Sequence, residues 1–133
     1  MTILRYVVVH DSGTLINPTI VEGQVHGGVV HGIGNALLEE CADDGQGHPA
    51  NPTFVDYLLP SIGDVPMLEV ADVETPSPFN PEGIKGAGEG GTIGAIPTIV
   101  SAVEDALRPF GMVLNQVPLQ RAEITLRIAR STR

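Results

Sequence analysis

The stretch Gly86-Ala87-Gly88-Glu89-Gly90-Gly91 holds four glycines and one carboxylate in six residues, and the rest of the fold is predicted around it. Glycine suits positions that need a positive φ or a close approach of the backbone, at an entropic cost of about 0.5–1 kcal/mol in regular structure. Such a loop can turn its N–H groups toward a bound group. Glu89 has the wrong charge for a phosphate, but it can act as a general base if burial shifts its pKa toward neutrality. For the loop taken alone, a solvated glutamate in a flexible turn is the favoured interpretation.

The segments next to this loop are an extended run and a helix. Residues 76–81 contain three prolines, which impose an extended, irregular path into the loop. After the loop, residues 92–108 predict a helix, and Pro97 is tolerated there only in the first turn, where donors are unpaired anyway. The apolar stripe expected on this helix is Ile96, Ile99, Val100, Val103 and Leu107. Gly111 is predicted to end this helical segment, and residues 118–130 predict a short amphipathic helix.

A long helix is predicted from Asn17 to about Glu40. Asn17 is a good N-cap, and Pro18 fits the first helical position, where its missing N–H costs nothing. The apolar residues expected to share one face are Val21, Val25, Val29, Ile33, Ala36 and Leu37.

Five glycines interrupt this helix, and each costs roughly 1 kcal/mol relative to alanine. They are Gly23, Gly27, Gly28, Gly32 and Gly34. The pairs 23/27 and 28/32 are four residues apart, so they form flat patches that another helix or a flat ligand can approach. Gln24 lies among them and offers both a donor and an acceptor. His26 and His31 are five residues apart, which does not suit a metal site on one helix face, and both are interpreted as packing or surface residues.

Two strands are predicted elsewhere in the chain. Residues 3–10 are β-branched and aromatic and end at the turn signal Asp11-Ser12-Gly13, which predicts a buried strand. Residues 67–74 predict a second strand with Leu68, Val70 and Val73 facing inward. Between the first helix and this strand, residues 41–52 predict an exposed loop or hairpin, and residues 51–59 predict a short helical turn that ends before Pro60. The expected fold class is α+β, with few strands packed against the two longer helices.

Composition limits the class of protein. The chain has 133 residues, which fits one domain (1–133) or part of one, and its 4% aromatic share predicts an aliphatic core. A formal net charge of −9 argues against nucleic acid or anionic membranes as partners. The single Cys41 excludes an internal disulfide and any cysteine-ligated cluster built from this chain alone. No apolar run approaches the ~18–20 residues of a membrane span, so a cytoplasmic location is expected.

A nucleotide-binding interpretation of the loop fails on context. Gly86, Gly88 and Gly91 match the GxGxxG pattern, but a proline-rich run precedes them instead of a strand. No acidic residue follows about 20 positions later at the end of a second strand.

Several separate motifs together resemble one known family over residues 3–108. The motifs are Asp11-Ser12-Gly13, Asn17-Pro18, 22–28 (EGQVHGG), Gly32-Ile33-Gly34, 51–54 (NPTF), Asp56-Tyr57, 74–76 (ETP), Asn80-Pro81 and 83–91 (GIKGAGEGG). With them the chain is similar to the C-terminal end of the molybdenum-binding large subunit of the xanthine dehydrogenase, aldehyde oxidase and aerobic carbon monoxide dehydrogenase family.

The resemblance implies roles for individual residues. In that family the glutamate of the glycine loop is the active-site base, which takes a proton from a hydroxide on molybdenum, and this role falls on Glu89. The family's glutamine hydrogen-bonds near the molybdenum and pterin, and this role falls on Gln24. The resemblance also implies cofactor contacts for the surrounding glycines, namely Gly23, Gly27, Gly28, Gly86, Gly88, Gly90 and Gly91, whereas Lys85 is interpreted as structural.

The resemblance further implies a molybdopterin-type molybdenum cofactor, with iron–sulfur clusters and FAD on other subunits or domains. Expected partners are the remainder of the molybdenum-binding subunit and the iron–sulfur and flavin subunits, with self-association of the isolated chain. Pro97 stands where the family usually carries a smaller helix former, so a shortened helix is expected. The chain is expected to be inactive without the missing upstream part. The alternative is a free-standing, non-catalytic relic or binding module with the same fold, and the substrate stays open among purines, aldehydes, N-heterocycles and carbon monoxide.

Overall fold

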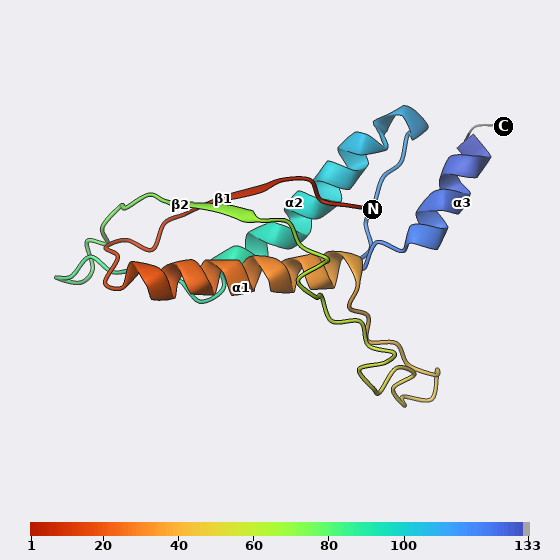
Figure 1. Cartoon of the computed structure of the whole chain (residues 1–133), viewed down its shortest axis with the longest axis horizontal. Helices are drawn as coiled ribbons and strands as arrows, with labels where there is room; N and C mark the ends of the chain where they lie inside the picture. The colour runs from red at the N-terminus through yellow and green to blue at the C-terminus, as the bar shows by residue number, and fades with distance from the viewer. Residues whose placement is uncertain (132–133) are drawn as a thin grey trace.

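The computed structural model describes residues 1–131, and its elements confirm the predicted α+β class (Figure 1). In chain order they are β1 (Tyr6–His10), α1 (Pro18–Leu37), β2 (Leu68–Asp72), α2 (Gly90–Ala106), the 3-10 turn η1 (Arg108–Phe110) and α3 (Arg121–Ser131).

The sheet consists of β1 and β2, which pair in parallel with Tyr6 opposite Leu68 and His10 opposite Asp72. A parallel pair needs a long crossover connection, and α1 lies in that connection. Alternate residues, among them Tyr6, Val8 and Val70, pack against the core, since the helices lie on that side.

The other face of the sheet corrects two expectations. Val7 is 50% exposed and Val9 is 60% exposed, so the prediction that the first strand is buried is wrong for these residues. Val73 is 52% exposed, because it follows β2 on the odd-numbered face, and the prediction that it faces inward is also wrong. Within residues 1–131 nothing provides a second layer over this face.

Helix α1 begins where the capping signal predicts. The Asn17 Oδ1 accepts a hydrogen bond from the backbone N–H of Ile20 at 3.3 Å, and Pro18 is the first helical residue. The helix ends at Leu37, about one turn before the predicted end. Four residues of the predicted apolar face have no exposed surface: Val25, Val29, Ile33 and Ala36. The core is aliphatic as expected, apart from Tyr6.

Helix α2 packs directly on the glycines of α1. A Cβ atom at Gly32 would lie 2.4 Å from the Cβ of Ala95, and one at Gly28 would lie 3.0 Å from the backbone nitrogen of Thr92. One predicted flat patch, Gly28 with Gly32, therefore admits a helix. No atom lies within 4 Å of a Cβ added at Gly23 or at Gly27, so the other patch is open.

Pro97 lies inside α2 instead of in its first turn. The helix begins at Gly90, two residues before the predicted start, and it continues past Pro97 to Ala106. The expectation that Pro97 shortens the helix is therefore wrong. The Thr98 hydroxyl donates to the Gly94 carbonyl at 2.6 Å and so occupies one acceptor in the turn around the proline. The 3-10 turn η1 that follows α2 ends at Gly111, which has the left-handed φ of +61° that favours glycine.

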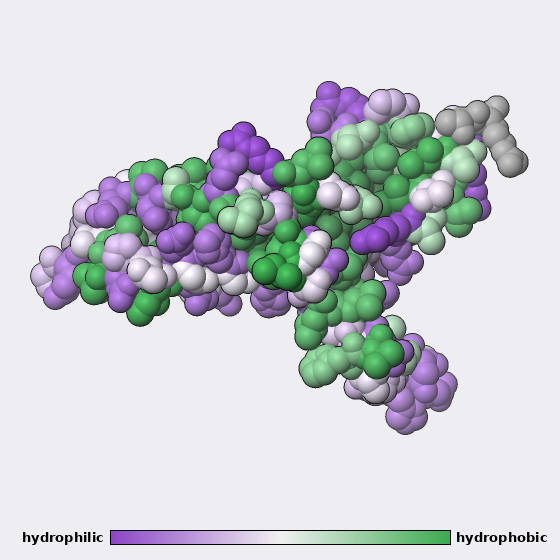
Figure 2. Space-filling view, viewed as in Figure 1, coloured by the Kyte–Doolittle hydropathy of each residue, from purple (hydrophilic) through white to green (hydrophobic). Residues whose placement is uncertain are grey.

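The segment 38–66 projects from the end of α1 as an arm (Figure 1). It is an exposed loop that contains one isolated turn at the predicted place, in which the Tyr57 N–H donates to the Thr53 carbonyl at 2.8 Å, the i to i−4 bond of a helical turn. Figure 2 shows hydrophobic residues on the arm next to its hydrophilic tip. Phe54 is 84% exposed and Ile62 is 96% exposed, which is unusual for large apolar side chains. No helix among residues 1–131 combines the length and apolarity needed to cross a membrane.

Candidate functional site

One hydrogen bond joins the two segments that sequence analysis singled out. The Gln24 amide Nε2, on α1, donates to the carbonyl oxygen of Gly88 in the glycine loop at 2.6 Å. These residues are 64 positions apart. The bond joins the first half of α1 to the residue that precedes Glu89.

A groove of about 360 Å³ runs between α1 and the start of α2 at this point. Its walls combine open backbone with polar side chains. The lining residues are Gln24, Gly27, Gly28, His31, Gly88, Glu89, Thr92 and Ile93. Gln24, Gly27, Gly28, Gly88 and Glu89 were all named as site residues from the sequence.

The glycines named from the sequence divide into two groups. A Cβ at Gly91 would lie 2.7 Å from the Val25 carbonyl oxygen, so the backbone of α1 excludes a side chain there, and one at Gly90 would lie 2.1 Å from His10 Nε2, so the His10 ring would have to move. Gly28 belongs to this packed group as well. No atom lies within 4 Å of an added Cβ at the members of the second group, which are Gly23, Gly27, Gly86 and Gly88. Packing within this chain gives no reason for glycine in the second group.

Glu89 is the residue immediately before α2. Its backbone carbonyl accepts hydrogen bonds from the N–H groups of Thr92 at 3.0 Å and Ile93 at 3.1 Å, and its side chain makes no capping bond. The carboxylate is therefore available at the groove. The side chain is exposed, so residues 1–131 do not supply the burial that the sequence-based argument for a general base invoked.

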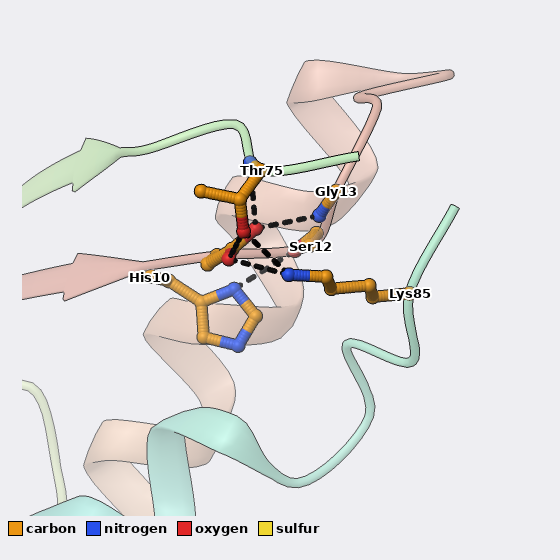
Figure 3. Close-up of polar contacts among 6 residues, drawn as sticks. His10, Ser12, Gly13, Thr75 and Lys85 are labelled. Carbon is orange, nitrogen blue, oxygen red and sulfur yellow. Dashed lines mark hydrogen bonds and ion pairs between the residues drawn. The ribbon is translucent and has the colours of Figure 1, made fainter. Parts of the chain in front are cut away.

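A second polar cluster holds the entry to the glycine loop (Figure 3). The Asp11 carboxylate accepts from the Gly13 N–H at 2.8 Å, from the Lys85 ammonium at 2.7 Å, and from both the hydroxyl and the N–H of Thr75. These bonds, that from Lys85 above all, hold the pKa of the Asp11 carboxyl well below its usual range. The contacts fit the structural role that the sequence suggested for Lys85.

The fold also brings His10 and His31 to the loop and the groove, where the sequence did not predict them. The His10 ring lies against Gly90, and its Nδ1 is 2.8 Å from the Ser12 hydroxyl. His31 is exposed, as expected for a surface residue, yet it lines the groove. The only available signals were their positions, since His10 precedes a turn motif and His31 is one helical turn beyond Gly27 and Gly28. Among residues 1–131 no group of three or more His, Cys, Asp or Glu side chains could hold a metal ion.

Comparisons with known proteins agree on one family. Residues 1–66 match the model of the molybdopterin cofactor-binding domain. The chain is 48% identical over 110 residues to the nicotine 6-hydroxylase large subunit of Paenarthrobacter nicotinovorans, covering 83% of this chain. It is 40% identical over 114 residues to the carbon monoxide dehydrogenase large chain of Hydrogenophaga pseudoflava, covering 86% of this chain.

A solved structure has the same fold. The structure of quinoline 2-oxidoreductase from Pseudomonas putida 86 superimposes with a TM-score of 0.88 at 44% identity, covering 98% of this chain. The chain spans only 14% of each of the two curated relatives and 16% of the solved chain. It therefore matches one segment of much longer proteins.

Proposed function

The chain belongs to the xanthine dehydrogenase, aldehyde oxidase and carbon monoxide dehydrogenase family, as a segment of its molybdenum-binding large subunit, and from this premise we propose that the groove between α1 and α2 holds part of the molybdenum cofactor. The observation that carries the proposal is the bond from Gln24 to Gly88, because it joins the amide, the open glycines and Glu89 around one groove.

The residues of the groove fit such a group. Gly27 and Gly88 line the groove, and Gly23 and Gly86 are close in the sequence to residues that line it. All four present backbone with free space where a side chain would lie, and a flat ring system can approach such backbone closely. The Gln24 side chain is exposed, so its amide oxygen can accept a hydrogen bond while its nitrogen holds Gly88. Gln24 and these four glycines would contact the cofactor, whereas Gly28, Gly90 and Gly91 would serve mainly to let α2 and the loop pack against their neighbours.

Glu89 is the proposed general base. The bound cofactor would supply the two-electron oxidation of the substrate. Glu89 lines the groove, and its carboxylate makes no capping hydrogen bond to α2, so it can take a proton from the water-derived nucleophile at that site. A positioned base of this kind typically contributes ~10²–10⁴-fold to the rate. The product would be a substrate hydroxylated with oxygen from water.

The groove opens to solvent on this chain, so the proposed reaction needs walls from elsewhere. We infer that the remainder of the molybdenum-binding subunit covers the groove, selects the substrate and buries Glu89, and that iron–sulfur and flavin subunits receive the electrons. Apolar side chains are exposed on the arm and on the sheet face that carries Val7 and Val9. They support an association of this kind, or self-association when the chain is isolated. The chain alone should therefore be inactive.

Cofactor content tests the proposal. The chain is purified alone and together with the remainder of its subunit, and molybdenum and pterin are measured in each. We expect both in the joint preparation, with Gln24→Ala lowering their content and Gln46→Ala, an exposed glutamine on the arm, leaving it unchanged. Absence of molybdenum from both preparations would instead support the non-catalytic module.

A further inference from the structure

Glu89 belongs to a loop that is held at three points, and only one of them is in the groove. The middle of the loop is held by the bond from Gln24 to the Gly88 carbonyl. The end is held where Gly90 lies against the His10 ring and Gly91 against the backbone of α1. The start is held at Lys85, outside the groove, by the cluster of Figure 3.

In the cluster at Lys85, the side chains of Lys85, Thr75 and Asp11 are each hydrogen-bonded to the other two. The Lys85 ammonium donates to Asp11 at 2.7 Å and to the Thr75 hydroxyl at 2.5 Å, and the Thr75 hydroxyl donates to Asp11 in turn. The ion pair is only partly exposed, with 36% of the Lys85 side chain and 32% of the Asp11 side chain accessible. Three segments meet there: the end of β1, the chain after β2 and the residue before the glycine loop.

The backbone repeats the same connection. The Lys85 N–H donates to the Ser12 carbonyl at 2.9 Å, and the Thr14 N–H donates to the Gly83 carbonyl at 3.1 Å. Gly13 has a φ of +65°, and a Cβ there would lie 2.2 Å from the Gly83 carbonyl oxygen. The turn after β1 therefore needs glycine in order to pair with the residues that lead into the loop.

The loop itself cannot supply this order. Gly86 and Gly88 make no close contact at the Cβ position, and glycine-rich backbone loses more freedom on ordering than any other sequence. Glu89 follows Lys85 by only four residues, so the direction of its side chain depends on where the loop starts.

We propose that Asp11 and Lys85 are positioning residues for Glu89, acting through the start of the glycine loop and without touching the groove. Thr75 completes the cluster as the hydroxyl that receives from Lys85 and donates to Asp11. This inference rests on the proposed function of Glu89, but its structural part does not require the cofactor.

The structural part is tested on the 133-residue chain by hydrogen exchange. The N–H groups of Thr92 and Ile93 bond to the Glu89 carbonyl, so their exchange reports the position of that residue. In Asp11→Asn and in Lys85→Met we expect these two amides to exchange at least tenfold faster, with amides in the middle of α1 unchanged. Glu69→Gln is the matched control, because it breaks the exposed pair with Arg5 on the same sheet away from the loop. The proposal is overturned if the Thr92 and Ile93 amides keep the wild-type rate, or if amides throughout α1 and α2 accelerate equally.

The functional part is tested in the assembled enzyme. Asp11→Asn and Lys85→Met should each lower kcat about tenfold or more at an unchanged KM and unchanged molybdenum content, and Lys85→Arg should restore part of the rate. The double variant should be no worse than either single variant, because both remove one interaction. Wild-type kcat in both single variants would overturn the positioning role. A different outcome would overturn only the proposed function of Glu89. In that outcome the Thr92 and Ile93 amides exchange faster in Asp11→Asn and Lys85→Met, but the Glu89→Gln enzyme stays active.

Discussion

The two glycine patches on α1 allow a matched test of what each is for. Gly32→Ala places a Cβ 2.4 Å from the Cβ of Ala95 and 3.2 Å from the Thr92 carbonyl oxygen. Carbon atoms in contact normally lie ~3.5–4.0 Å apart, so α1 and α2 would have to separate by roughly 1 Å or more at this point. Overpacking of this kind costs about 1–3 kcal/mol. Alanine returns roughly 0.8–1 kcal/mol in helix propensity, which leaves a net loss of about 0–2 kcal/mol.

Gly27→Ala is the control on the same helix. Nothing lies within 4 Å of its added Cβ, so the propensity gain of about 0.8–1 kcal/mol should appear without a packing cost. Urea unfolding of the 133-residue chain, followed by far-ultraviolet circular dichroism, measures both free energies. The two variants should differ in unfolding free energy by about 1–3 kcal/mol, with Gly27→Ala the more stable, because the propensity gain is common to both. Equal stability of the two variants, or a stabilised Gly32→Ala, would refute the assignment of one patch to helix packing and the other to open surface.

Three further predictions concern the groove, the cluster and Pro97. Gly27→Ala should lower the molybdenum content of the assembled subunit although it stabilises the chain, and unchanged content would remove Gly27 from the cofactor contacts. Because the folded pKa of Asp11 is depressed, its stabilisation is present above its unfolded value of about 3.9 and is lost as the pH falls toward the folded value. The unfolding free energy of Asp11→Asn should therefore fall less steeply than that of wild type below about pH 4, and parallel pH curves would contradict this. Pro97→Ala should raise the unfolding free energy by about 1–3 kcal/mol, because it restores an interior helix donor, and a loss of stability would show that the proline fits α2 without cost.

Local signals predicted the elements of the fold, and long-range contacts decided their surroundings. Asn17-Pro18 marked the start of α1, and Gly111 marked the stop after α2, because capping and left-handed glycine are properties of a few adjacent residues. The burial of β1 was predicted wrongly, since Val7 and Val9 depend on what covers the second face of the sheet. Pro97 was placed wrongly because the start of α2 lies inside the glycine loop.

The contacts around the candidate site show the same division between local and long-range signals. Glycine content drew attention to Glu89, and the family resemblance joined it to Gln24, but no periodicity connects residues that are 64 positions apart. The contacts of His10 with Gly90 and of Asp11 with Lys85 are likewise tertiary and have no local pattern. The resemblance and the fold together were needed to place them around one loop.

The role of Glu89 is tested most directly by the turnover of Glu89→Gln in the assembled enzyme, at molybdenum and pterin contents matched to wild type. Glu82→Gln, an exposed acidic residue shortly before the loop, is the control for charge. We expect Glu89→Gln to lose at least ~10²-fold in kcat with the cofactor retained, and Glu82→Gln to keep wild-type turnover. Activity of Glu89→Gln within about tenfold of wild type would contradict a general-base role, because a positioned base contributes ~10²–10⁴-fold.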